Sequence, residues 1–190
     1  ALGKQVLYIL DAPHLFDRPG SIYLGPDGTD WPDNPERFAA LSDTAARIGA
    51  EGIEGWQPDI LHLHDWQAGL APVYLQQRGA ADRVATLVTI HNIAFQGLAP
   101  ATRLDRLGLP EDGFTPSGFE YYGRISALKA GLVYADGLST VSSTYADELT
   151  TPEFGMGLDG VLRDRQAALT GILNGIDLGV WTPPYRAPRG

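Results

Sequence analysis

Short runs of aliphatic and β-branched residues recur along the chain, each the length of one β-strand. They predict five strands, at residues 6–10, 59–64, 85–90, 137–141 and 169–173. Turn residues follow these runs, and segments with helical periodicity lie between them. Strands that alternate with helices are typical of an α/β fold, so we expect a Rossmann-like parallel sheet with helices on both faces.

The helical segments are recognised by apolar residues spaced three and four positions apart. The clearest helix starts near Asn34 and Pro35, where proline suits the first helical position and asparagine suits the cap before it. Further helices are predicted at residues 66–74, 125–135, 144–149 and 158–165. Residues 97–123 are rich in proline and glycine, and they predict a long irregular excursion of the kind that is often functional or mobile.

Composition narrows the classes of function. The chain has 190 residues, of which 14 are Lys or Arg and 23 are Asp or Glu, giving a net charge of −9. The basic residues are scattered, which argues against nucleic acid as a partner. There is no cysteine, which excludes disulfides and thiolate metal sites and fits the cytoplasm. No run of 18 apolar residues predicts a membrane span.

Polar residues gather where four of the predicted strands end. In open α/β sheets, ligands bind beyond the carboxyl ends of the strands, so these residues are candidates for one shared site. The pairs are His64-Asp65, His91-Asn92, Ser142-Ser143 and Asn174-Gly175.

Each pair also has a structural interpretation. Asp65 can cap a helix that begins at Trp66, and Ser142 with Ser143 more readily caps a helix than supplies a nucleophile. His91 can be an ordinary buried histidine, and Asn174 with the glycine after it can be a tight turn.

Phosphate-binding glycine motifs are missing from the sequence.

A metal site is a further alternative. His62 and His64 lie two residues apart, so they share one face of their strand. A metal-dependent hydrolase would need further ligands, and the only other histidines are His14 and His91. We therefore expect no metal, with one histidine of the pair packed on the sheet and the other in the cleft.

Seven segments, in this order, resemble bacterial glycogen synthases and plant starch synthases. They run through nearly the whole chain: Leu15-Phe16-Asp17-Arg18-Pro19-Gly20, Asp33-Asn34-Pro35-Glu36-Arg37-Phe38, His64-Asp65-Trp66-Gln67-Ala68-Gly69-Leu70, Thr89-Ile90-His91-Asn92-Ile93-Ala94-Phe95-Gln96-Gly97, Leu128-Lys129-Ala130-Gly131-Leu132-Val133-Tyr134-Ala135-Asp136, Thr151-Pro152-Glu153-Phe154-Gly155 and Ile172-Leu173-Asn174-Gly175-Ile176-Asp177.

The resemblance implies a fold and a reaction. Such enzymes have two Rossmann-like domains around a cleft (the GT-B arrangement), and they transfer glucose from ADP-glucose to the non-reducing end of an α-1,4-glucan with retention. They use no cofactor. The resemblance implies that residues 1–176 are part of the N-terminal catalytic domain and residues 177–190 the start of an interdomain linker. The nucleotide-binding C-terminal domain is absent, so we expect this chain to be inactive alone.

The resemblance also assigns roles to residues of this chain. It implies that His91 hydrogen-bonds the donor glucose near its 6-hydroxyl and that Asp65 lies at the reaction centre, which makes these two the catalytic candidates. Candidate substrate-binding residues are Asn174, Tyr23, Asn92 and Gln96. Gln67 stands where many relatives have histidine, and it receives no catalytic role.

The competing hypothesis is a protein that binds glucan without turning it over. Exposed tryptophans can stack on sugar rings, and Trp31, Trp56 and Trp181 are the candidates, although isolated tryptophans more often serve packing. Glucan affinity without any requirement for ADP-glucose would favour this hypothesis.

Overall fold

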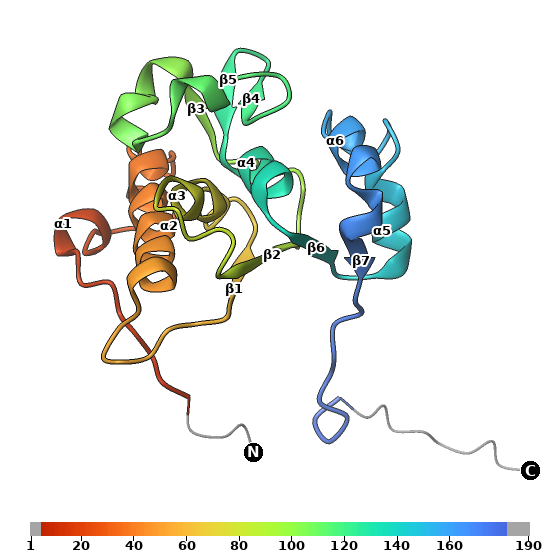
Figure 1. The fold of residues 1–190 in the computed structure, drawn as a ribbon, viewed down its shortest axis with the longest axis horizontal. Coiled ribbons are helices and arrows are strands. Elements are labelled where there is room, and N and C mark those ends of the chain that lie inside the picture. The colour runs from red at the N-terminus through yellow and green to blue at the C-terminus, as the bar shows by residue number, and fades with distance from the viewer. Residues whose placement is uncertain (1–4, 182–190) are drawn as a thin grey trace, which may run out of the picture.

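The computed structural model describes residues 5–181. A four-stranded sheet and the helices around it form the body of the structure (Figure 1). The elements of this body are α1 (Pro13–Phe16), α2 (Asn34–Glu51), β1 (Ile60–His64), α3 (Ala71–Gln77), β2 (Ala85–Ile90), α4 (Ala127–Tyr134), β6 (Gly137–Thr140), α5 (Ser143–Leu149), α6 (Asp159–Asp164), η4 (Gln166–Ala168) and β7 (Leu169–Gly171).

The main sheet is parallel throughout, in the order β1-β2-β6-β7. The α/β class and the Rossmann-like parallel sheet are therefore confirmed. The predicted strand at 85–90 is β2 without change, and β1 starts one residue later than expected. β6 ends one residue early and β7 two residues early.

The first predicted strand is wrong. Residues 6–10 form no strand, and Val6, Leu7 and Ile9 are 76–80% exposed. A strand requires a partner for its backbone groups, and in the described structure this segment pairs with none. Instead it runs beside the end of α2, where the ring of Tyr8 stacks on Trp56 with 6.1 Å between centroids.

The core lies on one face of the sheet. Leu63, Val88 and Leu138 alternate with outward-facing positions and pack under α3 and α4. Figure 1 shows α2, α3 and α4 side by side over this face. On β1 the opposite face is exposed and carries His62 and His64. One sheet face thus supplies the packing, and the other presents polar side chains.

The entry to α2 differs from expectation by one residue. Asp33 takes the cap position, and Asn34 is the first helical residue, with only 8% of its surface exposed. The Asn34 amide donates to the carbonyl of Tyr23 at 3.0 Å. Arg18 pairs with Asp33 through two contacts of 2.6 and 2.7 Å, which hold the pKa of the Asp33 carboxyl below its usual range. These bonds fix the loop that carries Tyr23.

The predicted excursion at 97–123 is more ordered than expected. It is built from β3 (Leu98–Pro100), η1 (Ala101–Arg103), η2 (Asp105–Leu107), η3 (Glu111–Gly113) and β4 (Glu120–Tyr121). With β5 (Arg124–Ser126) the two strands form an antiparallel sheet in the order β3-β5-β4. Because Ile125 pairs within this sheet, α4 starts at Ala127 and not at 125.

A buried lysine attaches this small sheet to the body. Lys129 on α4 is 6% exposed, and its Nζ donates to the carbonyls of Pro116 and Glu120 at 2.6 and 2.5 Å. Burial lowers the pKa of Lys129. A buried cation that satisfies two loop carbonyls holds the β4–β5 hairpin in one position.

Ser142 caps α5, as the sequence predicted. Its side chain accepts from the backbone N–H of Tyr145 at 3.0 Å, so the capping interpretation is confirmed.

None of the helices in the described part of the chain has both the length and the apolar character that a bilayer crossing requires.

We predict that replacing the buried Tyr74 by phenylalanine destabilises the fold in a pH-dependent way. The Tyr74 hydroxyl donates to the carbonyl of Leu107 at 2.5 Å, and burial raises the pKa of Tyr74. At pH 7, Tyr74→Phe should lower the free energy of unfolding by about 1–3 kcal/mol. A raised folded pKa gives stability that is present below about pH 10 and lost as the pH rises further. The difference between wild type and variant should therefore shrink above pH 10.

Urea unfolding at pH 7 and pH 10.5 measures both effects. Tyr122→Phe is the control, because Tyr122 is 79% exposed, and it should match wild type at both pH values. An unchanged gap between wild type and Tyr74→Phe at high pH would contradict the assignment.

Candidate functional site

Asp65 joins the ends of two neighbouring strands. It follows β1 with φ 51°, a left-handed conformation that aspartate tolerates better than most residues. Its Oδ1 accepts the backbone N–H of His91 at 2.7 Å and that of Asn92 at 3.3 Å. The capping interpretation is wrong, because α3 begins at Ala71 and residues 65–70 form turns. The carboxylate instead fixes the backbone that leaves β2.

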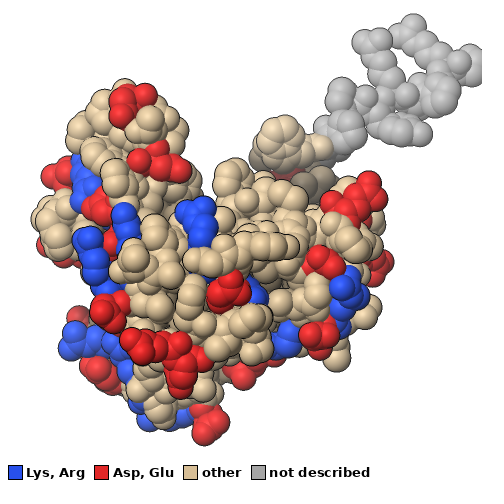
Figure 2. Space-filling model, turned by 90° about the horizontal axis from the view of Figure 1, so that it is seen from above, with Lys and Arg blue, Asp and Glu red and all other residues tan. Residues whose placement is uncertain are grey.

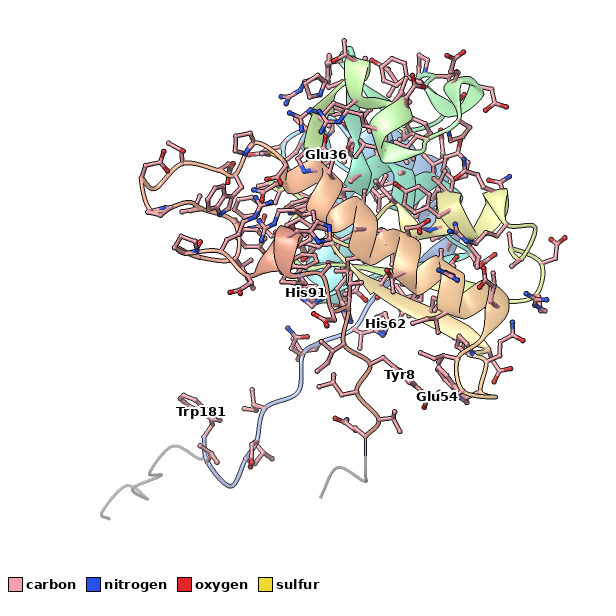
Figure 3. The ribbon with its side chains drawn as sticks, turned by 90° about the vertical axis from the view of Figure 1, so that its left-hand side faces the viewer. Tyr8, Glu36, Glu54, His62, His91 and Trp181 are labelled. Atoms are coloured by element: carbon pink, nitrogen blue, oxygen red, sulfur yellow. The ribbon has the colours of Figure 1, made fainter. Side chains whose placement is uncertain are left out.

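A row of histidines lies along the exposed face of β1 and the end of β2. His64 Nδ1 is 3.0 Å from His91 Nε2, and the rings of His62 and His64 have centroids 4.4 Å apart. Figure 3 shows His62 and His91 on the same side of the sheet. The sequence therefore placed both β1 histidines on one face correctly, and one of them reaches the end of the neighbouring strand.

His62 is bonded to the sheet. Its Nε2 lies 2.7 Å from Thr89 Oγ1, which is 2.6 Å from Ser139 Oγ. Among the described residues, no group of three or more His, Cys, Asp or Glu side chains is arranged to hold a metal ion. The hydroxyl partners of His62 give this histidine a structural role.

The imidazole of His64 is held in its neutral form. Burial lowers the pKa of His64, and the charges of His62 and His91 lower it further, while Asp65 acts in the opposite direction. Nδ1 of His64 and Nε2 of His91 share one hydrogen bond, in which either nitrogen can be the donor. Nδ1 of His91 is then the ring nitrogen that remains for a ligand.

Tyr23 lies at the same end of the sheet. Gln67 Nε2 donates to the Tyr23 hydroxyl at 2.7 Å. The Tyr23 ring also contacts Phe38 and Trp66, with centroids 5.7 and 6.1 Å away. Gln67, to which the sequence assigned no catalytic role, therefore orients the tyrosine. Its place two residues after Asp65 was the signal that could have indicated this.

The remaining polar candidates follow β2. Asn92 is exposed, and its Oδ1 accepts the backbone N–H of Ala94 at 3.0 Å, which shapes the turn after the strand. Gln96 is buried at 7% exposure, and its Nε2 donates to the carbonyl of Met156 at 3.2 Å. Gln96 therefore links this turn to the loop after α5.

A large hollow opens beside these residues. It has a volume of about 900 Å³, within the range of small-molecule sites. Asp65, Tyr23 and Gln96 line it, together with aromatic and basic residues that sequence reasoning did not single out. Those additional residues are Trp66, Phe95, Arg103, Tyr121 and Arg124.

The arginines at the hollow are already engaged. Arg103 Nη1 donates to the carbonyl of Pro32 and to Glu36 Oε2, each at 2.7 Å. Arg124 Nη2 donates to the carbonyl of Leu98 at 3.3 Å. On the face shown in Figure 2, Lys and Arg are interspersed with Asp and Glu and form no basic patch. Of the two arginines, Arg103 is therefore paired with a carboxylate, whereas Arg124 donates to a carbonyl.

Asn174 is not among the residues that line the hollow. It lies in exposed coil after β7, at the opposite edge of the sheet from β1. Two strands, β2 and β6, separate these edges, and neighbouring strands lie about 4.8 Å apart. Asp65 is hydrogen-bonded to the backbone of His91 and Asn92, although these two residues are not among those that line the hollow either.

The three tryptophans proposed for sugar stacking are dispersed. Trp31 lines the hollow, with the Arg18 guanidinium 5.0 Å from its ring centroid. Trp56 stacks on Tyr8 beyond the end of α2, and Trp181 extends from the C-terminal segment (Figure 3). Only the first is positioned to contact a ligand in the hollow.

The family model described as the starch synthase catalytic domain matches residues 3–164. The glycogen synthase of Paracoccus denitrificans is 72% identical over 190 residues, which is all of this chain and 40% of that protein. The glycogen synthase of Roseobacter denitrificans is 59% identical over 177 residues, covering 93% of this chain and 37% of the relative.

A solved structure agrees with these sequence matches. The catalytic domain of starch synthase IV from Arabidopsis thaliana, bound to ADP and acarbose, superimposes with a TM-score of 0.75 at 30% identity. The match covers 94% of this chain and 36% of that one. The chain thus spans about two fifths of the length of the curated relatives it matches.

We predict that Asp65→Ala releases the backbone after β2. The alanine removes the acceptor for His91 and Asn92 and is less tolerant of the positive φ. Hydrogen exchange at these two amides should become at least about tenfold faster, by loss of a hydrogen bond to a charged group. Asp65→Asn keeps an acceptor oxygen and should give an intermediate rate. Exchange that is unchanged in Asp65→Ala would contradict the bridging role.

We predict that the histidine row destabilises the fold in acid. Because the folded pKa of His64 lies below its unfolded value, its contribution is present above about pH 6.5 and lost as the pH falls. The free energy of unfolding should therefore decline between pH 7 and pH 5, and His64→Asn should decline less. His14→Asn, on α1 and outside the row, should follow wild type. Parallel curves for wild type and His64→Asn would exclude this effect.

Proposed function

The chain belongs to the family of starch synthase catalytic domains, and from this premise we propose that it forms the sugar-binding part of an α-glucan glucosyltransferase. The proposed reaction transfers glucose from ADP-glucose to the non-reducing end of an α-1,4-glucan with retention of configuration. The bond from glucose C1 to the diphosphate breaks, and ADP leaves with the electron pair. A bond forms from C1 to the acceptor 4-hydroxyl oxygen, which loses its proton to the departing diphosphate.

One observation carries the proposal. The carboxylate of Asp65 lines a hollow of about 900 Å³ and also accepts the backbone N–H of His91, so these two residues meet at the ends of adjacent parallel strands. This is where ligands bind in open α/β sheets. The starch synthase IV structure is bound to ADP and acarbose, which supports a nucleotide and a sugar as ligands of this chain also.

The proposed roles follow from charge and hydrogen-bonding capacity. Asp65 stabilises positive charge that develops on the glucosyl ring in an oxocarbenium-like transition state. His91 offers its free ring nitrogen to a glucose hydroxyl, for which we propose the 6-hydroxyl. Asn92, Gln96 and Tyr23 contact the sugars, and Asn174 approaches the glucose from the far edge of the sheet.

The leaving ADP requires positive charge, of which the described hollow offers little. Arg103 and Arg124 line the hollow, but Arg103 is paired with Glu36, and Arg124 donates to the carbonyl of Leu98. We propose that residues 1–176 belong to the first catalytic domain, that 177–190 begin a linker, and that nucleotide-binding cations come from the part of the relatives that this chain does not cover. Most of the proposed linker, residues 182–190, lies outside the described residues.

A chimaera tests the proposal. The Paracoccus denitrificans glycogen synthase would carry this chain in place of its matching segment, and at 72% identity we expect the core to be compatible. The chimaera should incorporate labelled glucose from ADP-glucose into glycogen. His91→Ala should lower kcat/KM by about 100- to 1000-fold, the range for loss of one transition-state donor. His14→Ala, on α1, should leave it unchanged.

The isolated chain supplies the second arm. We expect no ADP release from ADP-glucose and glycogen above a blank, together with measurable binding of a malto-oligosaccharide. Turnover by the isolated chain would overturn the proposed division of roles. A folded chimaera that is inactive, or one that ignores His91→Ala, would overturn the assigned reaction site.

A further inference from the structure

Three tight turns in the chain share one backbone conformation but carry different side chains. Each is a non-glycine residue at φ 47–51° followed by a glycine at φ 76–79°. Left-handed backbone costs an ordinary side chain about 1–2 kcal/mol, and asparagine or glycine is the common choice. The pairs are Glu54-Gly55, Tyr122-Gly123 and Met156-Gly157.

Two of these turns meet at the mouth of the hollow. Tyr121 lines the hollow, and its hydroxyl donates to the carbonyl of Met156 at 2.6 Å. A Cβ on Gly157 would lie only 2.8 Å from that hydroxyl, so the turns are in direct contact. Gln96 donates to the same carbonyl. The turn at Tyr122 and the turn at Met156 therefore form one rigid edge.

This edge exposes large apolar side chains. Tyr122 is 79% exposed, and its ring packs edge-on against Tyr121 with centroids 4.7 Å apart. Phe95, which also lines the hollow, is 63% exposed. We call Phe95, Tyr121 and Tyr122 the aromatic rim. Exposed aromatics held together beside a hollow indicate a binding surface more than packing.

Hydrogen bonds hold the hairpin that carries Tyr121 and Tyr122 in one position. Lys129 holds the carbonyl of Glu120 at the start of the hairpin, and Glu120 Oε1 accepts the N–H of Gly123 at 2.5 Å. Tyr122 is exposed and lies in a strained turn on a fixed hairpin, which lowers the stability of the fold. Among the described contacts, only the one with the Tyr121 ring offsets this loss. Such strain is typical of functional positions.

We propose that the aromatic rim binds glucose units of the α-glucan acceptor beyond those next to Asp65, with Tyr122 as its outer stacking residue. The inference rests on the proposed function, and it adds a binding surface to it. Pyranose rings present C–H groups that pack on aromatic faces, and Phe95 and Tyr121 of the rim line the same hollow as Asp65, with Tyr122 packed against Tyr121. A glucan whose end reaches Asp65 can therefore pass over Tyr121 and Tyr122 on its way out.

The experiment measures calorimetric affinities of the 190-residue chain for maltose and for maltoheptaose. Tyr122→Ala should weaken maltoheptaose binding about five- to tenfold, the loss of one ring contact, and leave maltose binding unchanged. Tyr122→Asn should weaken it equally while the melting temperature stays the same or rises, because asparagine suits the left-handed turn. Weaker binding by a fold of equal stability separates ligand contact from structural support.

Glu54→Asn is the matched control. It relaxes the same kind of turn, but Glu54 lies past the far end of α2 from the hollow-lining Pro35 (Figure 3). α2 has 18 residues, which span about 27 Å. Glu54→Asn should bind maltoheptaose as wild type does.

The outcomes separate the two proposals. If the wild type binds maltoheptaose and neither Tyr122 variant weakens this binding, the proposal for the aromatic rim is overturned. The proposed function is then unaffected. An equal loss for maltose and maltoheptaose would also overturn the proposal for the rim, because the rim would then act at the reaction centre. A wild-type chain without affinity for maltoheptaose would overturn both the rim and the glucan-binding role of this chain.

Discussion

The in-register pairing of β1 with β2 is the constraint on which the site depends. His64 lies opposite Thr89, so the two strands leave the sheet almost level with each other. One carboxylate, that of Asp65, can then accept N–H groups from the chain leaving β2. A slip of one residue would turn Leu63 out of the core and His64 into it. The hydrophobic pattern that stabilises the sheet therefore also aligns the polar residues of the site.

Strand positions and the meeting of polar residues could be predicted because they follow from this pattern. β2 agreed to the residue, and Asp65 meets His91 as expected. The run at 6–10 looked equally strand-like, but a strand depends on its partner, which a local pattern does not specify. The role of Asp65 was missed for a related reason. A cap and a cross-strand acceptor use the same side chain, and only the tertiary arrangement selects between them.

Backbone strain is distributed unevenly over the molecule. Four described non-glycine residues have positive φ, and Asp65, Tyr122 and Met156 are all next to the hollow or its edge. The fourth, Glu54, occupies an ordinary surface turn. No sequence pattern predicted the strain at Tyr122. A tyrosine followed by a glycine is common, and only the folded hairpin gives this tyrosine a positive φ. Strain at these positions costs stability, so its concentration here is an argument for function that sequence reasoning could not supply.

The charges that line the hollow bear on which part of the substrate this chain contacts, the sugar or the nucleotide. The polar lining of the hollow combines two carboxylates with neutral amides and two phenols, and its arginines donate to groups of Pro32, Glu36 and Leu98. Burial, and then the charges of His62 and His91, lower the pKa of the neighbouring His64. Neutral donors and acceptors match sugar hydroxyls, which are themselves neutral and both donate and accept. Of the two arginines that line this hollow, Arg103 is paired with Glu36, which leaves little positive charge for a diphosphate. This is why we propose that sugar recognition lies on this chain and most of the nucleotide-binding charge elsewhere.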